Sequence, residues 1–117
     1  MQKYFSIIIL EEADLFLTNL DQKTKEKIIY NIDKASFTMD KELFKKLNSN
    51  IWEFRTLYNS KAYRLFSFWD KESECYVVCT HGILKKTQKT PQKEIDRAVM
   101  IMKKYFESKK KNKNRKA

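Results

Sequence analysis

The chain has 117 residues, of which 42% are apolar and 14% aromatic, and it carries a formal net charge of +10 at pH 7. This length suits one small domain, and the apolar fraction excludes a chain that is disordered throughout. The excess charge lies in residues 85–117, which hold thirteen Lys and Arg against three acids, and such a basic end on a neutral body favours a polyanionic partner.

The first half of the chain predicts one strand followed by helices. Residues 3–10 are apolar enough for a short strand. Asp21 can cap the second of two helical segments, which we expect to form an antiparallel hairpin. Residues 37–50 predict a short helix or a turn. The helical spacing rests on Ala13, Phe16, Leu17 and Leu20 in the first segment, and on Thr24, Ile28, Ile32 and Ala35 in the second.

The second half predicts a three-strand antiparallel meander and a final helix. The strands cover residues 51–58, 62–69 and 74–84, with a tight turn at Asn59-Ser60 and a polar turn at 70–73. Gly82 interrupts the last strand, which indicates a bulge or a close backbone approach. Thr90 can cap the final helix and Pro91 suits its first position, while the apolar stripe of that helix indicates a packed face.

Together these elements predict an α+β domain. A small antiparallel sheet, made of the N-terminal strand and the meander, packs one face against the N-terminal helical hairpin and the C-terminal helix. We expect this single domain to span residues 1–107. Residues 108–117 form a basic tail, for which a flexible, solubilising role is an equal alternative to binding a polyanion.

Nothing in the sequence indicates export, a membrane span or a metal. The apolar run at residues 7–10 is short and ends at Glu11 and Glu12. Cys75 and Cys79 would lie about 13 Å apart along a strand, beyond the reach of a disulfide or a shared metal ion. We therefore expect a cytoplasmic protein with no metal, no small-molecule cofactor and no membrane partner.

Several short motifs occur in the same order as in a known family. The chain resembles the RelE/ParE toxin superfamily, and within it the phage-derived HigB-like toxins. The similarity runs from the first strand to about Phe106 and leaves the basic tail outside. It rests on Trp52-Glu53-Phe54-Arg55, Tyr63-Arg64, His81-Gly82-Ile83-Leu84-Lys85-Lys86, Thr90-Pro91, Glu94-Ile95 and Ala98.

The resemblance implies the toxin of a type II toxin–antitoxin system with a RelE-like fold. Members commonly cleave mRNA on the translating ribosome and are neutralised by an antitoxin, which in the HigB-like branch usually carries a helix-turn-helix domain. We therefore expect a metal-independent endoribonuclease (an mRNA interferase) whose partners are the ribosome, mRNA and such an antitoxin. Two alternatives stay open: a ParE-like toxin that inhibits DNA gyrase, and a non-catalytic nucleic-acid-binding module with the same fold.

Cleavage through the 2′-hydroxyl needs a base, an acid and cations around the phosphate. The predicted phosphate-stabilising residues are Arg64, Lys85 and Lys86. For Arg64 the resemblance adds that arginines on the open sheet face contact the scissile phosphate, and the planar guanidinium suits two phosphate oxygens. His81 is the candidate base or acid, although it could instead be a packed histidine that shares a strand face with Cys75, Val77 and Cys79.

Four further cations are predicted to bind RNA: Arg55, Lys89, Lys93 and Arg97. Lysines beside the start of a helix form a favourable anion site, which supports Lys89. Arg55 has an alternative role as a structural partner of Glu53, two residues away on the same strand face. The chain departs from the HigB-like pattern because it has no second histidine, which leaves the acid and base unassigned.

Overall fold

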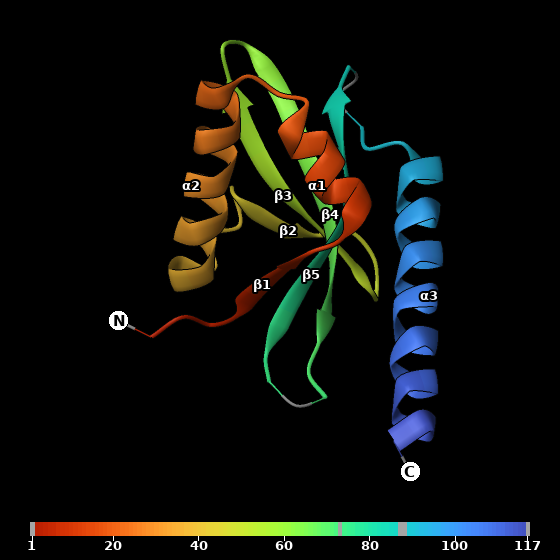
Figure 1. Ribbon diagram of the computed structural model, residues 1–117. Helices are drawn as coiled ribbons and strands as arrows, with labels where there is room; N and C mark the ends of the chain where they lie inside the picture. Colours follow the sequence, from red (N-terminus) through yellow and green to blue (C-terminus); the bar gives the residue numbers. More distant parts are fainter. Residues whose placement is uncertain (1, 73, 87–88, 117) are drawn as a thin grey trace.

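The computed structural model describes residues 2–72, 74–86 and 89–116, with side chains through residue 112. The described residues form five strands and three helices, which are labelled in Figure 1. The strands are β1 (Ser6–Ile9), β2 (Phe44–Lys46), β3 (Ile51–Tyr58), β4 (Lys61–Asp70) and β5 (Tyr76–Lys85), and the helices are α1 (Glu11–Thr18), α2 (Gln22–Thr38) and α3 (Gln92–Lys116).

The five strands form one sheet in the order β1-β5-β4-β3-β2. The predicted α+β class and the β3–β4–β5 meander are confirmed. Asn59 and Ser60 both have positive φ angles, as a two-residue hairpin turn requires. The pairing of β1 was predicted wrongly, because β1 runs parallel to β5 rather than antiparallel.

The segment predicted as a helix or turn contains the edge strand β2 instead. Phe44 of β2 is 1% exposed and stacks on the rings of Phe54 and Trp52, with centroids 4.3 Å and 4.7 Å away. Pairing with β3 places Phe44 over these rings, which explains why a segment of three residues forms a strand.

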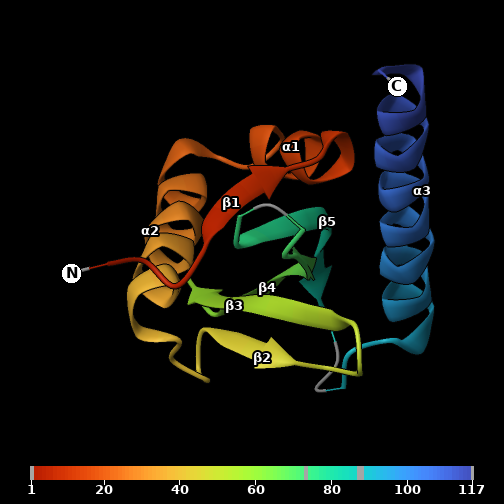
Figure 2. The ribbon, with the colours of Figure 1, turned by 90° about the horizontal axis from the view of Figure 1, so that it is seen from below.

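The helices cover both faces of the sheet, whereas we predicted that all would pack on one face (Figure 2). α1 packs over β5 and α2 over β3, so the apolar stripes of both helices face the sheet. α3 packs on the opposite face through Ile95 and Ala98, which contact the cluster of Ile51, Phe66, Phe68 and Val78. Asp21 caps α2 as predicted, accepting a hydrogen bond from Thr24 N at 3.2 Å.

The far end of α3 is attached to the end of β4 by a buried carboxylate. Asp70 is 2% exposed and accepts hydrogen bonds from Tyr105 Oη and Lys109 Nζ, both at 2.7 Å. Lys109 also forms an ion pair with Glu72 at 3.1 Å. Residues 108–116, which we expected to form a separate tail, continue α3, while residue 117 lies outside the described residues. The flexibility of this segment and the domain end at residue 107 stay predictions.

Gly82 allows α1 to approach the backbone of β5. A Cβ atom at Gly82 would lie 2.3 Å from Cδ2 of Phe16 and 2.6 Å from two further atoms of the same ring. The predicted close approach is therefore confirmed at Gly82, while the irregularity in the β4–β5 ladder lies two residues earlier.

Gly82→Ala is expected to lower the free energy of unfolding by about 1–2 kcal/mol, because the added methyl group overpacks the contact with Phe16. The double variant Gly82→Ala, Phe16→Leu should recover part of this loss, since the smaller side chain makes room for the methyl group. Urea denaturation of the single and double variants measures both changes. Equal stability of Gly82→Ala and the unmodified protein would contradict the predicted contact.

Candidate nucleic-acid interface

Two arginines and one glutamate form the centre of the candidate site. Arg55 of β3 and Arg64 of β4 are direct partners in the antiparallel ladder, and Glu53 lies two residues before Arg55. The Glu53 carboxylate is 3.5 Å from Arg64 Nε and 3.8 Å from Arg55 Nε. Glu53 is 2% exposed and Arg64 is 7% exposed, so these charges interact largely out of water.

One carboxylate leaves a positive charge uncompensated within this group of three side chains. The Nε atoms of both arginines are buried and, among the described residues, make no hydrogen bond. Burial lowers the pKa of Arg64 and the charge of Arg55 adds to this effect, while Glu53 opposes it. An arginine side chain stays charged in proteins despite such shifts. Because these Nε atoms are buried, what the group offers a phosphate is its net positive charge.

Arg55 borders a depression of about 530 Å³, which we call the basic groove, whereas Arg64 lies next to Arg55 in the sheet and is not part of the groove lining. Its walls come from β2, β3, the end of β5 and the segment that enters α3. The groove is lined by Lys45, Lys46, Leu47, Glu53, Arg55, Lys85, Lys89, Thr90, Gln92 and Ile95. Five of these side chains are cations and one is an acid, so the groove favours an anionic ligand.

Lys85 is the groove lysine whose protonation is perturbed. Partial burial lowers its pKa, and the positive charge of Arg64 lowers it further, while Glu53 opposes both effects. Arg55 and Lys45 also lower the pKa of Lys85. A lysine with a lowered pKa can take up or release a proton closer to neutral pH than an ordinary lysine.

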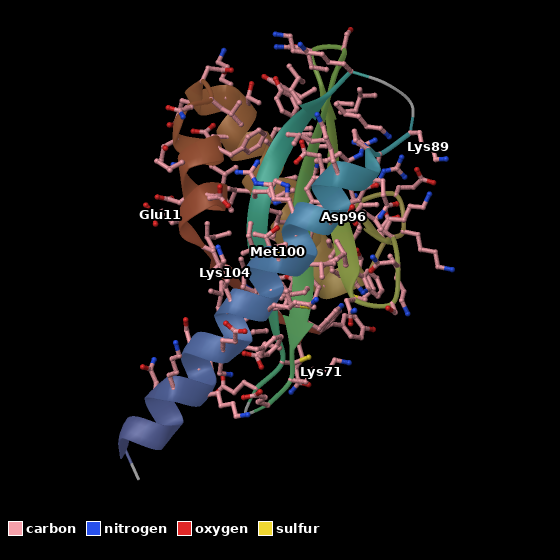
Figure 3. The ribbon with its side chains drawn as sticks, turned by 90° about the vertical axis from the view of Figure 1, so that its right-hand side faces the viewer. Glu11, Lys71, Lys89, Asp96, Met100 and Lys104 are labelled. Atoms are coloured by element: carbon pink, nitrogen blue, oxygen red, sulfur yellow. The ribbon has the colours of Figure 1, made fainter. Side chains whose placement is uncertain are left out.

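Figure 3 looks onto α3 and places Lys89 on one side of the helix and Glu11 of α1 on the other. The groove therefore lies on the Lys89 side, between α3 and β2. Arg97 was predicted to bind RNA, but its guanidinium forms ion pairs with Glu12 of α1 and Glu94. Lys93 is exposed on the first turn of α3, outside the groove lining.

The loop between β5 and α3 was predicted to bind phosphate through Lys85, Lys86 and Lys89. Lys85 and Lys89 line the groove, and Lys86 is exposed next to Lys85, while residues 87 and 88 lie outside the described residues. Thr90 was predicted to cap α3, but it does not. Its hydroxyl donates to Glu53 Oε1 at 3.1 Å, and Pro91 O accepts the first backbone hydrogen bonds of the helix. Glu53 thus connects the arginines to the start of α3.

A bulge in β5 places His81 on a different sheet face from the one predicted. Phe66 of β4 pairs with His81 while Ser67 pairs with Cys79, so Thr80 has no partner in the ladder. The extra residue reverses the alternation of side chains beyond it. His81 therefore lies on the α3 side and stacks on Phe66 with a centroid distance of 4.8 Å, whereas Cys79 packs on the α1–α2 side.

Both ring nitrogens of His81 have partners within the protein. Nε2 is 3.2 Å from Glu94 Oε1 and Nδ1 is 2.9 Å from the Thr80 hydroxyl. The side chain is 2% exposed and does not line the basic groove. Burial lowers the pKa of His81, the charge of Arg97 lowers it further, and Glu94 opposes both effects. Of the two roles considered for His81, the packed histidine is the one that this environment favours.

Acid is expected to destabilise the fold through His81. The pKa of His81 is lower in the folded protein than the value of about 6.5 expected in the unfolded chain, so the unfolded chain takes up the proton first. The contribution of His81 to the free energy of unfolding is therefore fully present above about pH 6.5, and it is lost as the pH falls towards the folded pKa. His81→Gln should flatten this decline, which urea denaturation at about pH 7.5 and 5.5 measures. The same decline in both proteins would contradict the assignment.

Sequence reasoning missed three residues that organise the site. Lys45 lies on a strand that was not predicted, and Glu53 was considered only as a partner of Arg55. Glu94 was treated as a helix-start residue rather than as the partner of His81. The alternating pattern of β3 already places Glu53 and Arg55 on one face, but the link to Arg64 requires the β3–β4 register.

The described residues contain no group of three or more His, Cys, Asp or Glu side chains that could hold a metal ion. None of the described helices has the length and apolar character needed to cross a membrane.

The fold and the groove define a small RelE-like α+β protein with a basic cleft beside its C-terminal helix. Residues 15–103 match the family described as phage-derived protein Gp49-like (DUF891). Because this match covers well over half of the sequence, the chain belongs to this family of Gp49/RelE-like toxins. No curated protein matches the chain. The resemblance to RelE-type toxins is confirmed at this level, and the HigB-like branch stays a prediction.

Proposed function

We propose that this protein is the toxin of a type II toxin–antitoxin pair and that it cleaves mRNA on the ribosome. The observation that carries the proposal is the pair of arginines that share one buried carboxylate beside the basic groove. This arrangement places a net positive charge at the groove, with Arg55 partly exposed in its lining. Membership in a family of RelE-like toxins supports the same activity.

The chemistry that fits this groove is attack by a 2′-hydroxyl on the adjacent phosphate. The 2′-oxygen forms a bond to phosphorus and the bond to the 5′-oxygen breaks, which leaves a cyclic phosphate and a 5′-hydroxyl. Charge grows on the non-bridging oxygens in the transition state, and we assign its stabilisation to Arg55 in the groove lining, to its ladder partner Arg64 and to Lys86. Glu53 keeps the two guanidinium groups in position through its ion pairs.

Lys85 is the residue that we assign to proton transfer. Burial and the charge of Arg64 lower its pKa, so its amine gives up a proton more readily than that of an ordinary lysine, and in the neutral form it would accept the proton of the 2′-hydroxyl. We assign this role to Lys85 rather than His81 because His81 is buried and both of its ring nitrogens have partners. The acid that protonates the 5′-oxygen could then be a ribosomal group or water.

The proposed partners are an antitoxin, the ribosome and mRNA. A helix-turn-helix antitoxin would neutralise the toxin, and the ribosome would present the mRNA strand to the groove. Lys89 at the rim of the groove, with Lys93 on α3, would contribute phosphate contacts outside the reacting centre.

The test is a purified translation reaction that contains ribosomes, one defined mRNA and the protein, with primer extension as the readout. Cuts that require ribosomes are the expected result, and a reaction without ribosomes is the control. Intact mRNA in the presence of folded protein would overturn the proposal. In that case a supercoiling assay with DNA gyrase distinguishes a gyrase-inhibiting toxin from a module that only binds nucleic acid.

A further inference from the structure

The basic groove continues around the edge of the sheet into two further depressions. One, of about 410 Å³, is lined by Lys41, Glu42, Phe44, Lys45, Lys46, Trp52 and Arg55. The other, of about 580 Å³, includes Lys46, Asn50, Trp52, Trp69 and Lys71 in its lining. Lys46 lines all three depressions, and Trp52 lines both of those beyond the groove. The three are therefore neighbours around the edge strand β2, and we call them together the path. It leads from Arg55 on the α3 face of the sheet to Trp52, which packs on the α1–α2 face.

Figure 3 labels one residue of each outer depression. Lys89 of the basic groove and Lys71 of the depression of about 580 Å³ both lie on the side of α3 away from Glu11. A flexible single strand could follow the path, with one phosphate at Arg55 and its neighbours near the β2 lysines.

Aromatic rings lie where the path leaves the basic groove. Trp52 is partly exposed, stacks on Phe44 with a centroid distance of 4.7 Å and meets Trp69 edge-on at 5.9 Å. Phe44 is 1% exposed, and its ring packs against one face of the Trp52 ring. Trp52 is therefore held in a fixed orientation while part of its ring borders two open depressions.

Cations surround these rings. Lys41, Lys45 and Lys46 lie along β2 and the segment before it, with Glu42 as the acid among the lining residues. Lys71 Nζ lies over the Trp69 ring, 4.9 Å from its centroid. A packing role alone explains the contact of Trp52 with Phe44, but it does not explain why lysines surround the exposed part of the ring. Supported aromatic faces beside backbone-binding cations are typical of single-strand binding sites.

We propose that Trp52 stacks on an unpaired base of the RNA, next to the nucleotide whose phosphate lies at Arg55, and that Lys46 contacts the phosphate between them. This inference rests on the proposed RNA-cleaving function and adds a base-binding subsite to it. Because any base can stack on an aromatic ring, the subsite would add affinity and fix the position of the strand without distinguishing one base from another. Loss of one such stack typically weakens binding about tenfold.

The first experiment measures fluorescence anisotropy of a labelled six-nucleotide RNA whose 2′-hydroxyls are methylated, so that it binds without being cleaved. In a series of otherwise identical RNAs, each position in turn lacks its base. We expect one position at which loss of the base weakens binding to the unmodified protein about tenfold. Trp52→Leu should bind all members of the series equally. Tyr58→Leu, on the same strand and in the same aromatic-rich core cluster, should retain the discrimination.

A second measurement does not require a change at Trp52. The chain has two tryptophans, so Trp69→Phe leaves Trp52 as the sole indole. The intact RNA should quench its fluorescence, and the RNA that lacks the critical base should not. Affinity falls as salt rises, and Lys46→Ala should make the slope of log affinity against log salt less steep by about one. Trp52→Leu should leave this slope unchanged.

The outcomes separate the two proposals. Salt-dependent binding that is indifferent to every missing base, with no quenching of Trp52, would overturn the stacking subsite and leave the proposed nuclease intact. Binding that neither depends on salt nor weakens in Arg64→Ala would contradict the basic groove and with it the proposed function.

Discussion

Arg64→Ala is expected to lower the rate of ribosome-dependent mRNA cleavage about 10²–10³-fold, the usual effect of removing one preorganised donor to a developing charge. Arg64 is the more deeply buried of the two arginines, with a side chain 8% exposed against 30% for Arg55. Its guanidinium is thus held in place with little solvent screening. Arg64→Lys should restore little activity, because a lysine lacks the planar pair of donors.

The control for this prediction is Lys104→Ala, which removes an exposed cation from α3 outside the groove lining. Lys104→Ala should keep nearly all of the cleavage rate. Thermal melts of both variants establish that the fold is intact, since Glu53 retains Arg55 and Thr90 as partners when Arg64 is absent. A folded Arg64→Ala protein that cleaves mRNA at the unmodified rate would refute the proposed centre.

Asp70→Ala is expected to lower the free energy of unfolding by about 3 kcal/mol, because it removes two hydrogen bonds to a charged group at a buried position. Burial raises the pKa of Asp70, but hydrogen bonds from Lys109, Tyr105 and the Glu72 backbone outweigh it and hold the pKa below its usual value. The contribution of Asp70 is therefore present above a pH of about 4 and is lost as the pH falls through its folded pKa.

Urea denaturation near neutral pH measures the loss in Asp70→Ala. The matched control is Asp33→Ala, which breaks an exposed ion pair between Asp33 and Lys3 and should change stability by less than about 1 kcal/mol. Burial and the hydrogen bond to Asp70 raise the pKa of Tyr105 to about 12, so its phenol remains a donor throughout. Similar losses in the two aspartate variants would contradict the structural role of Asp70.

The sequence predicted correctly those features that depend on residues close together in the chain. The Asp21 cap, the Asn59-Ser60 turn and the alternation in residues 51–58 each depend on neighbouring residues, and each is confirmed. The parallel pairing of β1 with β5 depends on contacts between distant segments, which periodicity does not specify. The strand β2 has three residues, too few for a pattern to establish.

The candidate site was predicted in part for the same reason. Arg55, Arg64 and Lys85 were expected to lie together, and the register of β3, β4 and β5 places them on one sheet face. The position of His81 depends on a bulge that exists only because β5 has one residue more than β4 can pair. No local signal at Thr80 announces that mismatch, so the face of His81 was assigned wrongly.

The bulge at Thr80 also bears on how this strand can change in length. Thr80 is the residue without a partner, so its deletion would leave Cys79 opposite Ser67 and His81 opposite Phe66, with Lys85 still on the groove side. Deletion of a residue between His81 and Lys85 would instead move the lysine to the other sheet face. Deletion of a residue should therefore disturb the groove less at the bulge than beyond it, and homologues with a shorter β5 should lack the residue at Thr80.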